Sequence, residues 1–277
     1  MLRKRHDLRT IAYLVITVGL FFYQWRYDGL FNPWLYPLTL FLSLSTAIIS
    51  HNQNHVSMWR SRPLNLLTNY VIGIFYGHPA IGWVPTHNLN HHKLNNRDGD
   101  LSICPRWFKG NHLLSLLIYP TITSLAQTKA IREYISGLRT RNRRLYWEAV
   151  SEYVVFFGLM AVAFLVDWKK ALFLLLIPQQ VALFTIQSIN FFQHVECDKT
   201  SEWNHSRNFT GPLVNALLFN NGFHTVHHEK PGVHWSELPD LHAQHAPKIG
   251  LECIEPSWPR WFARIYLVRP FRRLRPA

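Results

Sequence analysis

The chain contains 277 residues, of which 48% are hydrophobic and 14% aromatic, and its mean hydropathy is −0.05. This balance excludes a wholly soluble protein and one embedded throughout in a membrane, and it favours apolar spans joined to a large polar cap. The formal net charge of +13 fits nucleic acid, anionic lipid or an acidic protein as partner. Because long apolar runs are present, we expect lipid headgroups and no nucleic acid.

Two apolar runs near the N-terminus predict a first membrane hairpin. Residues 10–26 follow a basic start, and residues 34–50 carry no charge and lead directly into His51. Flanking aromatic residues extend both runs towards the roughly 20 residues that a membrane span needs. No convincing cleavage site of small residues follows the first run, so we interpret it as a retained anchor.

The middle of the chain is less apolar. Residues 63–84 and 111–127 carry no charge but contain polar or helix-interrupting residues, so we expect interfacial or partly buried segments. The stretch Lys129–Arg144 is strongly basic and predicts a solvated loop. Juxtamembrane basic clusters of this kind are typical of the cytoplasmic side of a membrane.

Residues 147–166 and 171–192 are two further apolar runs, and the short link between them predicts a second hairpin. The link contains Lys169 and Lys170, which depart from the rule that basic residues gather on the cytoplasmic side. Two hairpins place both termini and the basic 129–144 segment on one side of the membrane, which we expect to be cytoplasmic.

These features predict one all-α integral membrane domain over residues 1–277. It has four transmembrane helices in two hairpins, interfacial helices, and a helical cytoplasmic cap formed by part of 51–146 and by 193–277. The three cysteines are scattered, with no CxxC pair, which argues against a disulfide framework and a thiolate metal site.

Histidine is the unusual residue, with 16 copies, most of them clustered. Residues three or four apart share one face of a helix, so each cluster can direct two or three imidazoles to a common centre. A further histidine follows the fourth apolar run. The nine predicted ligands are His51, His55, His87, His91, His92, His194, His224, His227 and His228.

Nine imidazoles are too many for one metal ion and fit two ions with four or five ligands each. Imidazole suits iron, zinc, copper and nickel, but zinc sites use about four ligands. An isolated HxxxH pair is often a chance pattern. Three clusters where apolar runs end indicate a shared metal centre instead.

The three clusters resemble the histidine boxes of the membrane fatty acid desaturase and hydroxylase superfamily, in the same order and at similar spacing. The resemblance covers roughly His51 to His245, and the region from Asn221 onward looks like that of bacterial members. It implies two iron ions, O2 as co-substrate and electrons from an external donor. It also implies that Asn190, four residues before His194, reaches the metal through water.

By this resemblance we expect an O2-dependent desaturase of a fatty acyl chain in a bacterial inner membrane. The substrate would be an acyl lipid or an acyl chain on a carrier. Because the cap is basic, an acidic ferredoxin is a plausible electron donor. A hydroxylase, a ketolase or a terminal oxidative decarboxylase on the same iron site remains the alternative. A histidine-rich metal transporter is disfavoured, since the apolar runs contain almost no polar path.

Carboxylates near the boxes are candidates to orient the imidazoles by accepting their second N–H group. The candidates are Asp98, Asp100, Glu196, Asp198 and Glu229. The remaining histidines are expected not to bind the metal; they include His6, His78, His112, His205, His234, His242 and His245.

Overall fold

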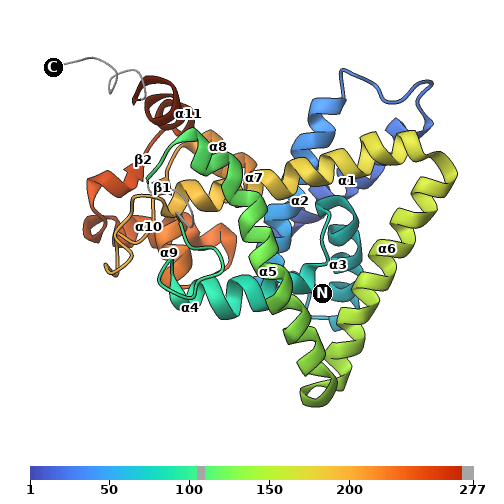
Figure 1. The fold of residues 1–277 in the computed structure, drawn as a ribbon, viewed down its shortest axis with the longest axis horizontal. Helices are drawn as coiled ribbons and strands as arrows, with labels where there is room; N and C mark the ends of the chain where they lie inside the picture. The colour runs from blue at the N-terminus through green and yellow to red at the C-terminus, as the bar shows by residue number, and fades with distance from the viewer. Residues whose placement is uncertain (105–109, 270–277) are drawn as a thin grey trace. The chain divides into compact units, whose positions relative to one another are not determined.

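The computed structural model describes residues 1–104 and 110–269, and there nearly all regular structure is helical, as predicted (Figure 1). The α-helices are α1 Asp7–Arg26, α2 Tyr36–His55, α3 Arg62–Tyr76, α4 His92–Leu94, α5 Leu113–Arg141, α6 Arg143–Ala171, α7 Ile177–His194, α8 Pro212–Leu217, α9 His224–Glu229, α10 Leu238–His245 and α11 Trp258–Phe262. The π-helices are η2 Val84–His91, η3 Leu172–Leu176 and η7 Ala263–Val268, and short 3-10 turns are η1 Ala80–Gly82, η4 Trp235–Glu237, η5 Ala246–Lys248 and η6 Leu251–Cys253. Strands β1 Asn208–Phe209 and β2 Ile254–Glu255 pair in parallel.

The chain divides into two compact units, each made of two stretches of sequence. The first unit contains Met1–Leu89 and Gln127–Ile186, and the second contains Asn90–Ala126 and Gln187–Ala277. The boundaries fall within η2, α5 and α7. The single domain predicted over 1–277 stays a prediction, and residues 270–277 at its end lie outside the described part.

In the first unit α2 packs against α1 and α3, and α3 packs against α6. The buried faces of α1 and α2 carry small hydroxyl residues, which let helix backbones approach closely. Some of these hydroxyls bond within their own helix: Thr17 donates to the Tyr13 carbonyl at 2.7 Å, and Thr46 donates to the Leu42 carbonyl at 2.8 Å. The first predicted hairpin is therefore a pair of packed helices.

Two helical runs in the described residues are long and apolar enough to cross a membrane, Asp7–Arg26 and Arg143–His194. The second run includes a backbone break at Asp167, where φ is −154° and ψ is 96°, at the position of the predicted link. Large apolar side chains of α6 face outwards, among them Phe157 at 61% and Leu165 at 86% exposure. Such a surface is unusual for a soluble helix and suits contact with lipid.

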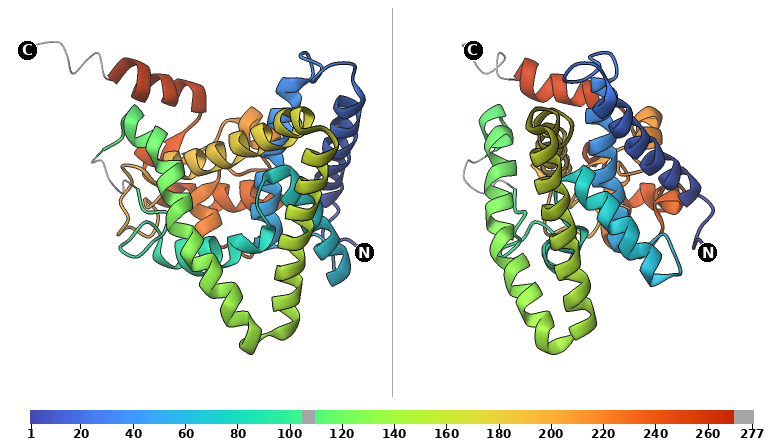
Figure 2. Two further views of the ribbon diagram at one scale, coloured as in Figure 1. Left: turned by 45° about the vertical axis from the view of Figure 1, so that its right-hand side comes forward. Right: turned by 90° about the vertical axis from the view of Figure 1, so that its right-hand side faces the viewer.

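The prediction of a loop over Lys129–Arg144 is wrong. α5 continues to Arg141 and α6 begins at Arg143, so only a tight turn at Asn142 interrupts the helices (Figure 2). Lysine and arginine are good helix formers, and their charged ends can remain in solvent along a helix. The Asn142 side chain accepts the Leu145 N–H group at 3.0 Å and caps the start of α6.

The weakly apolar segment 63–84 forms α3 and the start of the helical region that carries the second histidine box. Gly77 ends α3 with a φ of +95°, a left-handed conformation that favours glycine. Glu152 of α6 then accepts hydrogen bonds from the Ile81 N–H group and the Asn69 side chain, both at 2.9 Å. This buried carboxylate attaches the beginning of the second-box region to α6.

The second unit has an aromatic core built around Phe191 and Phe192 at the end of α7. The ring centroid of Phe192 lies 5.4 Å from that of Trp261 in α11 and 6.1 Å from that of Tyr266. The centroids of Trp261 and Tyr266 lie 6.0 Å apart. Because this core immediately precedes His194, it fixes the position at which α7 ends.

Candidate metal centre

The first unit brings together three predicted ligands. His51 and His55 lie one turn apart near the end of α2, with ring centroids 4.8 Å apart, as the four-residue spacing predicts. His87 of η2 joins them, and its Nε2 lies 2.9 Å from Nε2 of His51. Trp83 packs edge-on against His51 and His87. Thus the first box and the first histidine of the second box form one group, the three-histidine group.

The second unit holds a larger group made of His91, His194, His224 and His228, the four-histidine group. All four side chains are buried, and one nitrogen from each lies within 4.8 Å of the others. Nε2 of His194 lies 3.1 Å from that of His91 and 2.9 Å from that of His224. Nε2 of His228 lies 3.1 Å from that of His224. The same nitrogen of every ring is therefore directed to one point.

The remaining two predicted ligands form a pair in the second unit. Nε2 of His92 lies 3.2 Å from Nε2 of His227, and their ring centroids are 4.8 Å apart. Each adjacent His-His pair in the sequence is thereby divided, with one member in the four-histidine group and the other in this pair. His87 and His91 lie four residues apart on η2 but belong to different groups.

The spacing within the four-histidine group fits a metal ion. Two imidazole nitrogens bound at about 2.1 Å and at right angles around one ion lie roughly 3.0 Å apart. Without an ion, four buried imidazoles would place lone pairs or N–H groups directly against one another. A convergent set of nitrogen donors is therefore what these residues offer, and imidazole accepts iron as well as zinc.

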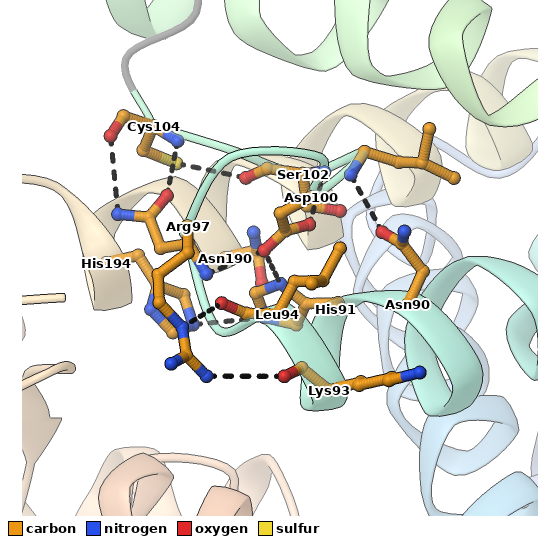
Figure 3. Close-up of polar contacts among 12 residues, drawn as sticks. Asn90, His91, Lys93, Leu94, Arg97, Asp100, Ser102, Cys104, Asn190 and His194 are labelled. Atoms are coloured by element: carbon orange, nitrogen blue, oxygen red, sulfur yellow. Dashed lines mark hydrogen bonds and ion pairs between the residues drawn. The ribbon is translucent and has the colours of Figure 1, made fainter. Parts of the chain in front are cut away.

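Asp100 determines which nitrogen of His91 carries the proton. Its carboxylate accepts from Nδ1 of His91 at 2.8 Å and from the backbone N–H groups of Asn96 and Ser102, both at 2.7 Å (Figure 3). Since an ionised carboxylate only accepts, the proton of His91 is on Nδ1 and the lone pair is on Nε2. The prediction that Asp100 orients a box histidine agrees with this contact.

Burial opposes ionisation of Asp100, but the attraction of His91 and the hydrogen bonds from His91, Ser102 and Asn96 outweigh it and lower the pKa of Asp100. The pKa of His228 lies well below its ordinary value, mainly because of burial and then because of neighbouring imidazoles. The His228 ring is therefore neutral at pH 7, which is the form that binds a metal.

His194 is oriented by a backbone group instead. Its Nδ1 lies 3.2 Å from the carbonyl oxygen of His205, so Nδ1 donates and Nε2 is available within the four-histidine group. His205 is itself buried, and burial lowers its pKa to about 4. Its Nε2 lies 3.3 Å from Glu229, which was predicted to orient a ligand and instead contacts this non-ligand histidine.

The other predicted orienting carboxylates bond elsewhere. The Asp98 side chain is 98% exposed and pairs with Lys199, while Asp198 accepts from Thr200. The Glu196 carboxylate accepts two hydrogen bonds from the Arg269 guanidinium group, at 2.8 and 3.0 Å. The prediction is wrong for these three residues, because exposed loop carboxylates find partners on the surface.

Asn190 lies on α7 one turn before His194, on the same face of the helix. Its Nδ2 donates to the hydroxyl of Tyr119 at 2.8 Å. Contact of Asn190 with a metal through water stays a prediction. The sequence provides no signal for Tyr119, which lies 71 positions from Asn190, or for the role of Glu152 as an anchor.

A protein-family model described as fatty acid desaturase matches residues 30–258. The matched region contains all nine predicted ligands and the helices that carry them. No curated protein was found to match the chain.

Proposed function

The chain belongs to the fatty acid desaturase family, whose members are oxidoreductases, and from this premise we propose that it is a membrane-bound di-iron enzyme that introduces a double bond into a fatty acyl chain. The single observation that carries the proposal is the four-histidine group, with four buried Nε2 atoms directed to one point. One iron ion would take these four ligands. The other five predicted histidines remain for a second ion.

Iron and O2 supply the oxidising chemistry that an unactivated methylene requires and that side chains alone lack. The overall reaction converts –CH2–CH2– and O2, with two electrons and two protons, into –CH=CH– and two waters. The protein would bind the metal with buried imidazoles and hold His91 and His194 each in one tautomer. Asp100 and the His205 carbonyl oxygen perform the orienting task for His91 and His194.

We further propose that four helices span a bacterial inner membrane, with both termini and the α5–α6 turn on the cytoplasmic side. The two long apolar runs and the break at Asp167 support this arrangement. The substrate is an acyl lipid or a carrier-bound acyl chain, and an external donor such as an acidic ferredoxin provides the electrons. The net charge of +13 favours an acidic partner.

Lipid profiling tests the reaction. Cells that express the chain should gain a double bond in their acyl chains, and cells that express His91→Ala should not. His112→Ala is the matched control, because His112 is exposed and contacts Ser115. Other products would contradict desaturation. An added hydroxyl group would indicate a hydroxylase, a keto group a ketolase, and a terminal alkene of a shortened chain an oxidative decarboxylase.

Metal analysis tests the centre itself. The purified chain should contain about two iron ions, the number that nine imidazoles accommodate. One zinc ion per chain would contradict the proposal.

A further inference from the structure

A chain of hydrogen bonds in the second unit connects buried His91 with half-buried Asn190. Asp100 accepts from Nδ1 of His91 at 2.8 Å and from the Ser102 N–H group at 2.7 Å. The Ser102 carbonyl oxygen accepts from the Tyr119 hydroxyl at 2.7 Å, and the Tyr119 oxygen accepts from Nδ2 of Asn190 at 2.8 Å. Asp100, Ser102 and Tyr119 are all buried.

The direction of these bonds determines the orientation of the Asn190 amide. A backbone carbonyl oxygen can only accept, so the single hydroxyl proton of Tyr119 goes to Ser102. The group of Asn190 that faces Tyr119 must then be a donor, which is its NH2 group. The carbonyl oxygen of Asn190 consequently points away from Tyr119.

Tyr119 is well held for such a task. Its side chain is 4% exposed, and its ring packs against Phe191 with the centroids 5.0 Å apart. Asn190 and His194 share one face of α7, and His194 belongs to the four-histidine group. A fixed Tyr119 therefore limits how the Asn190 amide can rotate beside the metal ligands.

We propose that Tyr119 is a positioning residue that holds Asn190 with its carbonyl oxygen presented to water at the metal centre. This inference rests on the proposed function. Tyr119 touches neither substrate nor metal in this role. It acts through Asn190, and the Asp100–Ser102 segment links the same bond chain to the ligand His91.

The test compares Tyr119→Phe and Asn190→Ala in the full-length, 57Fe-loaded protein. Tyr119→Phe keeps the ring and removes only the hydroxyl. We expect unchanged iron content, because no ligand is lost. In the reduced protein, Mössbauer spectroscopy should show that one iron signal shifts in the direction that Asn190→Ala produces. Product formed per O2 consumed should fall roughly two- to tenfold, the effect of one lost hydrogen bond.

The double variant Tyr119→Phe/Asn190→Ala separates positioning from a general structural effect. If Tyr119 acts through Asn190, the double variant should have the spectrum of Asn190→Ala alone. Additive spectral changes would overturn the proposal.

Tyr266→Phe is the matched control. Tyr266 belongs to the same aromatic core, is also buried, and donates its hydroxyl proton to the side chain of Asn111, outside the chain of bonds. Its removal should leave the iron spectrum as in the wild type. A spectrum of Tyr119→Phe that matches Tyr266→Phe and the wild type would overturn the role of Tyr119.

The two levels of the proposal fail in different ways. If the wild-type protein binds no iron, the proposed function is wrong. If the wild type shows its iron signals and Tyr119→Phe does not alter them, only the positioning role is wrong. Should Tyr119→Phe not fold, 3-fluorotyrosine at position 119 retains the hydroxyl and weakens the oxygen as an acceptor. It should cause a smaller shift of the same sign, and a wild-type spectrum would again overturn the proposal.

Discussion

Asp98 and Asp100 lie two positions apart, yet one is in solvent and the other is buried against His91. The backbone explains the difference. Asn95 and Asn96 adopt left-handed conformations, with φ of 47° and 62°, and turn the chain back over the end of α4. From the sequence alone, Asp98 and Asp100 were equal candidates. Left-handed conformations at asparagine are uncommon, and the sequence does not show that Asn95 and Asn96 adopt them.

Asp100→Asn should weaken iron binding about 10- to 100-fold, the usual effect of losing an orienting partner. An amide can present its NH2 group to His91 and favour the tautomer that carries the proton on Nε2, where the metal would bind. Iron retained after dialysis against a chelator measures the effect. Asp98→Asn is the matched control, and equal iron retention in both variants would show that Asp100 does not orient His91.

At the scale of the elements, the division of the ligands between groups could not be predicted from their spacing. The four-residue spacing of His87 and His91 fits one helical face, but it does not show that the two imidazoles join different groups. The positions of α1, α2, α6 and α7 were predictable, because long apolar runs specify helices strongly. The grouping of imidazoles depends on which distant elements meet, and periodicity does not show that.

Glu152 anchors the start of the second-box region, so its replacement should act on the fold and on the metal together. Glu152→Ala leaves the Ile81 N–H group and the Asn69 amide without their acceptor, at a cost of about 1–3 kcal/mol in unfolding free energy. Glu152→Gln keeps one acceptor oxygen and should lose less. Thermal unfolding of the detergent-purified protein measures both.

Glu148→Gln is the control for this effect, because Glu148 pairs with the half-exposed Arg62. Surface ion pairs of this kind contribute about 0–1 kcal/mol. If Glu148→Gln destabilises the protein as much as Glu152→Ala, the anchoring role of Glu152 is wrong.

Lys170, one of the two lysines in the link between the third and fourth apolar runs, has a structural role at the end of α1. Its ammonium group donates to the carbonyl oxygens of Trp25 and Tyr27 at 2.6 and 2.9 Å, at the C-terminal end of α1. A cation there complements the helix dipole, so Lys170→Met should cost about 0.3–2 kcal/mol of unfolding free energy. Denaturation of Lys170→Met beside Lys169→Met checks this, since Lys169 lies over the Trp168 ring. Equal stability of the two variants would contradict it.

At the scale of the whole molecule, the membrane topology is open to direct measurement. In a background without the native cysteines, single cysteines at Asp28 and Arg139 occupy exposed positions near the α1–α2 and α5–α6 turns. In intact cells, an impermeant maleimide should label Asp28→Cys and should label Arg139→Cys only after permeabilisation. The reverse pattern would invert the orientation, and labelling of both in intact cells would exclude the two-hairpin arrangement.

The division of each His-His pair has a consequence for changes in chain length. His91 and His92 share one peptide bond but serve different groups, as do His228 and His227. Inserting or deleting one residue next to either pair would misplace ligands of both groups at once. The two dipeptides therefore tolerate no change in length beside them without a loss of ligands in both groups.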